Sequence, residues 1–230
     1  VEAVANSELH FDSGCDVTNV DGTRLTGGTW SVADSGTINL PGSPQVVTNA
    51  ATVKLSGSAA SFAPLSALAV NEGTLELSNG QSLTVDGALS NAGLIDVDDT
   101  SALVLNPSTK VLSNAGVLSG GGSVNGNVIN TGQISPGASA GEMSITGDAQ
   151  FQSAGELLME IAGTGAGEWD RLAVSGDADL DGNVHAVLLD SFTPTSQVYT
   201  FDLVTFASRT GTFAGLDLDA PSGHPAVDAS

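Results

Sequence analysis

Three stretches of the chain share one five-residue phrase: Asn71-Glu-Gly-Thr-Leu75, Asn91-Ala-Gly-Leu-Ile95 and Asn114-Ala-Gly-Val-Leu118. Each stretch begins with asparagine, has glycine at its third position and ends in an aliphatic residue. Related stretches extend the series on both sides: Asp34-Ser-Gly-Thr-Ile38, Asn49-Ala-Ala-Thr-Val53 and Asn130-Thr-Gly-Gln-Ile134. The steps between the first residues of these six stretches are 15, 22, 20, 23 and 16 residues. A repeat with a period near this length is typical of a solenoid.

Alternating polar and apolar residues fill the chain between the phrases, which indicates short strands. Turn-forming pairs such as Asn79-Gly80, Asp86-Gly87 and Asn106-Pro107 separate these segments. One coil therefore has three short strands, and crossover connections between parallel strands are nearly always right-handed. We predict an all-β fold, a right-handed parallel β-helix (β-solenoid) with a C-terminal β cap module. The predicted strands of two coils are Thr74–Leu77, Ser82–Val85, Ala88–Ser90, Leu94–Val97, Ala102–Leu105 and Lys110–Ser113.

Equivalent residues of stacked coils lie above one another at about 4.8 Å, so the phrase predicts columns of like side chains. The asparagines that begin the phrases predict a structural ladder at one corner of the coil, in which each side-chain amide bonds the next. Asparagine also tolerates the left-handed backbone that such a corner can require. The ladder consists of Asn49, Asn71, Asn91, Asn114 and Asn130. One inner aliphatic column is expected from Ile38, Val53, Leu75, Ile95, Leu118 and Ile134, and a second from Leu40, Leu55, Leu77 and Val97.

The pattern of the sequence changes after Pro136-Gly137, where the repeated phrase ends. Longer strands are expected there, among them Glu156–Ile161, Asn183–Leu189 and Gln197–Phe206. We therefore divide the chain into β-helix coils over 1–137, a capping module over 138–219 and a tail or linker over 220–230. The capping module either continues the solenoid or forms a small sandwich-like cap, since an open solenoid end exposes unpaired strand edges.

Composition and charge restrict the partners. The 230 residues include 26 acidic and 5 basic side chains, for a formal net charge of −21. Such a field repels nucleic acid, because phosphate binding needs clustered lysine and arginine. No apolar run is long enough for a transmembrane segment. Cys15 is the only cysteine, so an intrachain disulfide is excluded.

An enzymatic role is considered because carbohydrate-active enzymes also use parallel β-helices. Glycoside hydrolysis needs two carboxylates about 5–9.5 Å apart. Asp96, Asp98 and Asp99 form the best acidic cluster, and Lys110 is the nearest base that a neighbouring strand could bring to it. Aromatic platforms for sugars are lacking nearby, so we expect a solvated outer face and no catalytic residues.

Calcium is the one cofactor that the sequence raises. Asp177, Asp179 and Asp181 alternate before Gly182, as in the start of a calcium loop, but Leu188 stands where the twelfth-position acidic ligand is required. The alternative is a simple hairpin corner at Asp181-Gly182, between two strands. No other cofactor is predicted.

Two further patterns are weak. His10, His185 and His224 share no metal-ligand spacing. Thr23, Thr37, Thr52 and Thr74 could suggest a threonine column for ice binding, but the column does not continue at Leu94 or Val117.

The second half of the chain resembles the C-terminal passenger region of bacterial autotransporter adhesins and proteins with autotransporter-associated β-strand repeats. The resemblance covers about residues 114–215 and is carried by three blocks: Asn130-Thr-Gly-Gln-Ile-Ser-Pro-Gly137, Gly141-Glu-Met-Ser-Ile-Thr-Gly147 and Glu168-Trp-Asp-Arg-Leu-Ala-Val-Ser-Gly176. It implies an extracellular or bacterial cell-surface location.

The expected function is that of a non-catalytic structural or adhesive β-solenoid with a host-surface, protein or polysaccharide ligand. The alternatives are a self-assembling fibre or sheath subunit, which would form homo-oligomers or filaments, and a polysaccharide-active β-helix enzyme.

Overall fold

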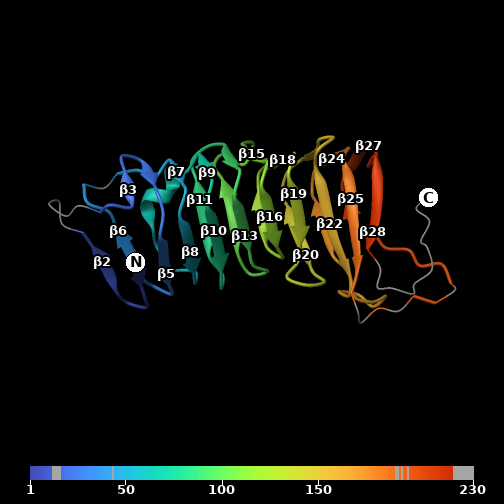
Figure 1. Ribbon diagram of the computed structural model, residues 1–230, viewed down its shortest axis with the longest axis horizontal. Coiled ribbons are helices and arrows are strands. Elements are labelled where there is room, and N and C mark those ends of the chain that lie inside the picture. Colours follow the sequence, from blue (N-terminus) through green and yellow to red (C-terminus); the bar gives the residue numbers. More distant parts are fainter. Residues whose placement is uncertain (12–16, 43, 190–191, 193, 196, 220–230) are drawn as a thin grey trace.

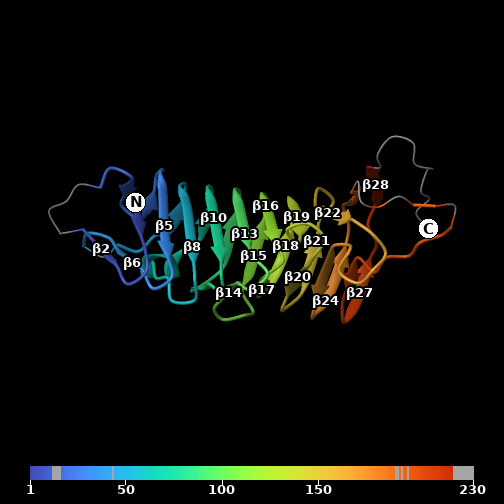
Figure 2. The same ribbon diagram turned by 90° about the horizontal axis from the view of Figure 1, so that it is seen from below.

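A computed structural model describes residues 1–11, 17–42, 44–189, 192, 194–195 and 197–219. Short strands stack along one long axis, with the N-terminus near one end and β28 near the other (Figure 1). Viewed from below, the strands of successive coils follow one another in the same order along the rod (Figure 2). The fold is the predicted parallel β-helix.

Three sheets run along the rod. Sheet 1 has ten strands, in spatial order β1 Glu2–Ala3, β5 Thr29–Ala33, β8 Thr52–Ser56, β10 Thr74–Ser78, β13 Leu94–Val97, β16 Val117–Gly120, β19 Gln133–Pro136, β22 Glu156–Ile161, β25 Asn183–Leu188 and β28 Gly215–Asp219. Sheet 2 has six, in the order β11 Ser82–Val85, β14 Ala102–Leu105, β17 Ser123–Asn125, β20 Glu142–Ile145, β23 Arg171–Val174 and β26 Val204–Thr205.

Sheet 3 again has ten strands, in the order β27 Ser208–Gly211, β24 Asp177–Leu180, β21 Ala149–Phe151, β18 Asn127–Asn130, β15 Val111–Asn114, β12 Leu89–Asn91, β9 Val70–Asn71, β7 Thr48–Asn49, β4 Arg24–Leu25 and β3 Val20–Asp21. From β10 to β27 the chain visits sheets 1, 2 and 3 in turn, six times over. Each round of the three sheets is one coil of three strands, as the sequence predicts.

The N-terminal coils depart from this plan. The short helix η1, Ala63–Ala67, replaces the sheet 2 strand after β8. One coil earlier, β6 Thr37–Asn39 pairs instead with β2 Glu8–His10 in a separate two-stranded sheet. The strand β3 runs antiparallel to β4, whereas the other strand pairs of the three long sheets are parallel.

The capping segment 138–219 continues the solenoid. Strands β20 to β28 extend the same three sheets with parallel pairing, so the sandwich-like alternative is wrong for the described residues. The long strand expected over Gln197–Phe206 is also wrong, since only β26 forms within it in the part that the structure describes. The tail predicted over 220–230 lies outside the described residues.

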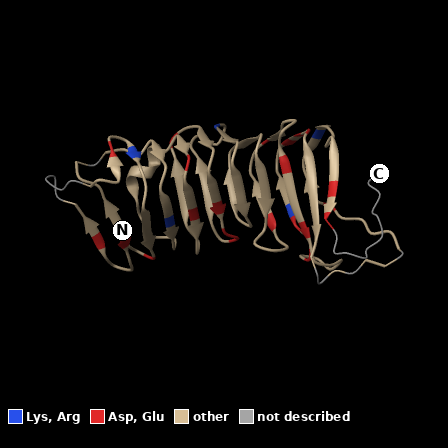
Figure 3. Ribbon diagram, viewed as in Figure 1, with Lys and Arg blue, Asp and Glu red and all other residues tan. Residues whose placement is uncertain are grey.

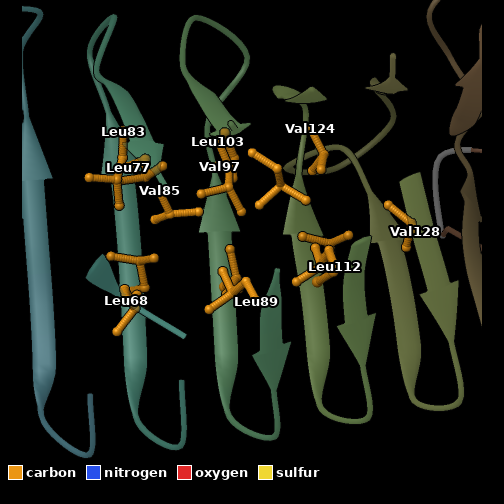
Figure 4. Close-up of a cluster of buried hydrophobic side chains, with 14 of the residues drawn as sticks. Leu68, Leu77, Leu83, Val85, Leu89, Val97, Leu103, Leu112, Val124 and Val128 are labelled. Carbon is orange, nitrogen blue, oxygen red and sulfur yellow. The ribbon is translucent and has the colours of Figure 1, made fainter. Parts of the chain in front are cut away.

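The core is a continuous apolar column between the sheets. Figure 4 shows leucine and valine side chains from neighbouring coils directed into this space, among them Leu77, Leu83 and Leu112. These three are at most 7% exposed. Because each coil covers the next, the burial of one aliphatic layer depends on the layers on either side of it.

Strand register confirms most of the predicted columns and corrects their N-terminal ends. Val53, Leu75, Ile95, Leu118 and Ile134 stack in register, but the residue that precedes Val53 is Trp30 and not Ile38. In the second column Val32, and not Leu40, precedes Leu55. Ile38 pairs with Leu9 in the two-stranded sheet, although it is fully buried in the same core.

The glycine at the third position of the repeated phrase is required for packing between coils and not for a turn. A Cβ atom on Gly93 would overlap the carbonyl oxygen of Gly73 in the preceding coil, and Gly116 stands in the same relation to Gly93. Neither glycine has a positive φ. Glycine is needed here because two coils approach closely at this corner.

Candidate functional site

The asparagine ladder is present in full. The side-chain amide nitrogen of each member donates to the side-chain oxygen of the next at 2.8 Å, from Asn49 through to Asn130. All five side chains are buried, with at most 1% exposure. The amide nitrogens also donate to main-chain carbonyls, for example from Asn71 to the oxygen of Leu94 at 3.0 Å. The ladder thus binds coil to coil inside the corner.

The ladder is bounded by apolar residues. Leu25 precedes Asn49 in register and Phe151 follows Asn130. Left-handed backbone is not the reason for asparagine here, because the ladder residues are absent from the positive-φ positions of the described chain. The reason is the amide group, which both donates and accepts and can therefore repeat indefinitely along a stack.

In the acidic cluster Asp96, Asp98 and Asp99, the first two carboxylates accept hydrogen bonds within the fold, and Asp99 is exposed. Asp96 accepts a 2.6 Å hydrogen bond from the hydroxyl of Ser119 in the next coil. Asp98 accepts from the main-chain nitrogens of Asn79 at 2.6 Å and Thr100 at 3.0 Å. Partial burial raises the pKa of Asp98, but hydrogen bonds from Ser101, Asn79 and Thr100 outweigh it and the net pKa is lowered. Such a carboxylate is held ionised as a turn acceptor, unlike a general acid, whose pKa is raised.

Lys110 does not join this cluster. It follows Pro107 at the corner between sheets 2 and 3, where its main-chain nitrogen donates to the Pro107 oxygen. Asp98 lies at a different corner, between β13 of sheet 1 and β14 of sheet 2. The expectation that a neighbouring strand could bring Lys110 beside these carboxylates is therefore wrong.

The three aspartates proposed for calcium also have separate partners. Asp177 accepts from the hydroxyl of Ser208 at 2.6 Å, and Asp179 accepts from the hydroxyl of Thr210 at 2.8 Å. Asp181 accepts from the nitrogen of Gly182, whose φ of +71° makes the corner between β24 and β25. Across the described residues, no group of three or more His, Cys, Asp or Glu side chains is placed to hold a metal ion. The loop is a strand-to-strand corner, but the hairpin expected there is wrong, because β24 belongs to sheet 3 and β25 to sheet 1.

Two of the histidines are far apart. His10 lies on β2 near the N-terminal end and His185 on β25 near the C-terminal end, while His224 lies outside the described residues. The ring nitrogen Nε2 of His185 lies 3.1 Å from the Asp219 carboxylate. The threonine column is shorter than expected and differently composed: Thr29, Thr52 and Thr74 stack, and Leu94 follows.

Sequence reasoning missed Asp170, a fully buried carboxylate. Its two oxygens accept hydrogen bonds from the main-chain nitrogens of Gly141 and Glu160, both at 2.8 Å. Burial raises the pKa of Asp170 to about 6, with the Glu160 charge adding to the effect and the two hydrogen bonds opposing it. Asp170 thus ties the 137–141 connection to β22. The adjacent Trp169 and Arg171 gave no signal that this aspartate points inward.

The outer surface is polar and acidic over its length. Figure 3 shows acidic residues spread from the first strands to the last, with few basic ones between them. One outward row on sheet 1 is made by residues in direct register: Ser31, Lys54, Glu76, Asp96, Ser119 and Ser135. Within it the Lys54 ammonium contacts the Glu76 carboxylate at 2.6 Å.

One shallow hollow of about 390 Å³ lies at the C-terminal end of sheet 1. The residues that line it are Glu156, Asn183, Val184, His185, Gly215, Leu216 and Asp217. These residues belong to the last three strands of the sheet. Gly215 follows Glu156 and Asn183 in register, and a Cβ atom on Gly215 would meet the side-chain oxygen of Asn183.

Comparison with known proteins finds no family model, curated protein or solved structure that matches this chain. No helix in the described part of the chain has the length and apolar character to cross a membrane.

Proposed function

We propose that this chain is a non-catalytic, extracellular or cell-surface β-solenoid that acts as a rigid structural or adhesive segment. The observation that carries the proposal is the unbroken stack of ten strands in sheet 1 over a continuous buried core. A solenoid of this kind presents long, regular rows of side chains and suits extended binding surfaces.

The use of the polar residues supports this reading. The buried amides form the ladder, Asp98 accepts hydrogen bonds at a turn, and Asp96 accepts one from Ser119 on the neighbouring strand. The acidic surface favours solubility outside the cell and repulsion between copies. The resemblance of residues 114–215 to autotransporter passengers supports a surface location. A ligand would bind along the outward rows, which are accessible over most of the rod.

The test combines three measurements on the purified chain. Negative-stain microscopy should show isolated rods, and the protein should be retained on surfaces coated with extracellular polysaccharide or matrix protein without degrading them. Filaments in place of rods would favour the self-assembling alternative.

Cleavage of acidic polysaccharides would overturn the non-catalytic assignment if the Asp98→Ala variant abolished it. A variant at the exposed Asp99, which makes none of the Asp98 hydrogen bonds described above, is the matched control.

A further inference from the structure

One fully buried carboxylate links the corners of two successive coils. Asp170 is 0% exposed and is the last residue of the connection between β22 and β23. One of its oxygens accepts the main-chain N–H of Gly141 at 2.8 Å, and Gly141 ends the 137–141 connection of the preceding coil. The other oxygen accepts the main-chain N–H of Glu160 on β22, also at 2.8 Å. A single side chain therefore fastens the earlier connection to the later coil.

The 137–141 connection is strained and lies directly against this carboxylate. Gly137 and Ser139 both have positive φ, at +85° and +94°. Left-handed backbone is unfavourable at a residue such as Ser139, which has a Cβ atom. A Cβ atom on Gly137 would lie only 2.6 Å from Oδ1 of Asp170. The connection is therefore held by its neighbours, the bond from Gly141 to Asp170 among them, and not by its own backbone preferences.

The buried carboxylate has no cationic partner in the described part of the chain. Arg171 is the next residue, but it lies on the exposed face of β23 and forms its ion pair there with Glu142. Successive residues of an extended chain point to opposite faces, so Asp170 faces inward where Arg171 faces outward. An ionised Asp170 is thus a buried charge without a counter-ion, which is costly.

The other charged groups around Asp170 do not neutralise it. Residues 137–141 carry no titratable side chain. Glu168 lies in the connection that precedes Asp170, and its carboxylate accepts the N–H of Gly165 within that connection. Glu160 is itself acidic, and its charge disfavours ionisation of Asp170. The two main-chain hydrogen bonds therefore offset only part of the cost of burying the charge.

Opening of the connection would let water reach the carboxylate. Burial raises the pKa of Asp170 from the ordinary value of 3.8 to about 6 while the connection is closed. The neutral carboxyl is therefore favoured in the closed form and the solvated carboxylate in the open form. By linkage, the ratio of open to closed molecules rises about 100-fold as the pH rises from 4 through 6, and it levels off above that.

We propose that Asp170 is a latch that closes in acid: its neutral carboxyl holds the 137–141 connection against the next coil, and ionisation of this carboxyl releases the connection. The release is a local opening at one corner and leaves the three sheets intact. This inference is independent of the proposed structural or adhesive role, which concerns the outward rows along the rod.

The test uses the full chain and hydrogen exchange of single main-chain amides, followed by NMR between pH 4 and 7 and corrected for the intrinsic exchange rate at each pH. The opening constant of the Gly141 amide should rise about 100-fold over this interval. The Asn79 amide is the internal control, because it donates to the Asp98 carboxylate of the next coil at the corresponding corner. The pKa of Asp98 is lowered, so Asp98 stays ionised and the Asn79 opening constant should stay nearly the same.

Removal of the titrating group supplies the decisive variant. Asp170→Asn changes the shape of the side chain little and should make the Gly141 opening constant independent of pH. The matched control is Asp148→Asn, which also removes a carboxylate that accepts a main-chain N–H, from Asp177 at 2.9 Å, but at an exposed position. It should leave the pH response of Gly141 unchanged. If Asp170→Asn does not fold, the comparison of Gly141 with Asn79 in the wild type still decides the question.

Three results would overturn the proposal. The first is a Gly141 opening constant that does not change with pH, and the second is a pH response that persists in Asp170→Asn. The third is an opening constant for Gly141 equal to those of the core amides of β13 and β16, because the opening would then be global unfolding and not release of one connection. Each of these results would refute the latch alone, whereas filaments or cleavage of polysaccharide would bear only on the proposed function.

Discussion

Replacement of Asn91 tests the amide ladder at its centre. The side chain of Asn91 accepts a hydrogen bond from Asn71 at 2.8 Å and donates to Asn114 at 2.8 Å. It also donates to the carbonyl oxygens of Val117 at 2.9 Å and Gly93 at 3.3 Å. Asn91 is fully buried, so water cannot replace these partners without opening the corner.

The magnitude follows from the contacts that alanine would remove. The amide nitrogen has two hydrogens for its three acceptors, so with the bond accepted from Asn71 the side chain makes three full hydrogen bonds. At about 1 kcal/mol each, their loss lowers the free energy of unfolding by about 3 kcal/mol. The buried side-chain oxygen of Asn114 would lose the amide donor that faces it, and burial of such an unsatisfied group costs about 1–3 kcal/mol in comparable cases. These two figures overlap, so we expect Asn91→Ala to destabilise by about 3–5 kcal/mol.

Asn91→Asp separates hydrogen bonding from packing, because it is nearly isosteric. Aspartate keeps the acceptor for Asn71 but turns an oxygen toward the acceptors of Asn114, Val117 and Gly93. It also buries a charge. We therefore expect Asn91→Asp to be more destabilising than Asn91→Ala near neutral pH, and to recover partly in acid, where the protonated carboxyl can donate one hydrogen bond.

The assay is urea unfolding followed by far-ultraviolet circular dichroism, with hydrogen exchange to locate the opened coils. Ser90→Ala is the control: Ser90 is the outward neighbour of Asn91 on β12, and its replacement should change stability by no more than about 0.5 kcal/mol. A cost below about 1 kcal/mol for Asn91→Ala would refute the reasoning, because hydrogen bonds removed from a buried ladder cannot be that cheap. So would an Asn91→Asp variant more stable than Asn91→Ala near neutral pH.

Three further predictions concern packing and charge. Gly93→Ala should destabilise the chain by several kcal/mol, because the new Cβ atom would overlap the Gly73 carbonyl oxygen. Gly27→Ala is the control and should be nearly neutral, because the space around Gly27 is open. Thermal unfolding of both variants measures the difference, and equal effects would contradict the prediction. Leu118→Ala should lower the free energy of unfolding by about 2–5 kcal/mol, because Leu118 is fully buried between Ile95 and Ile134. Equal stability of the wild type and this variant in urea would contradict continuous stacking. The pKa of Asp170 is raised to about 6 in the folded chain, so its protonated form stabilises the fold below about pH 4 and this contribution, about 3 kcal/mol, is lost as the pH rises through 6. The difference in unfolding free energy between wild type and Asp170→Asn should therefore shift against the wild type across that interval, and a difference that is flat with pH would show that the folded and unfolded pKa values are the same.

Local pattern was sufficient to predict the central coils. The predicted strands Ser82–Val85, Leu94–Val97, Ala102–Leu105 and Glu156–Ile161 coincide with β11, β13, β14 and β22. The coils of β11, β13 and β14 carry an asparagine, a glycine and an aliphatic residue at constant offsets, whereas β22 was predicted from its alternation of polar and apolar residues alone. Each residue type has a separate physical reason to recur, so the three signals agree on one register.

The candidate site was less predictable from sequence. Asp177, Asp179 and Asp181 resemble a metal loop in spacing, and Asp177 and Asp179 do share the outward face of β24. Their partners come from other segments, Ser208 and Thr210 of the next strand in the sheet, and these decide what each carboxylate does. Asp170 shows the converse case. Nothing adjacent to it marks it as buried, because its partners Gly141 and Glu160 come from two different coils.

The sequence by itself determined the solenoid class, the identity of the amide ladder and the members of the central aliphatic column, since all of these repeat along the chain. Only the tertiary structure decided where the columns begin, with Trp30 and Val32 taking the places expected for Ile38 and Leu40. It also decided that the last layer leaves Leu216 exposed. The physical reason is that register is set by hydrogen bonds between coils, and the corners can lengthen or shorten without changing the pattern of the strands they connect.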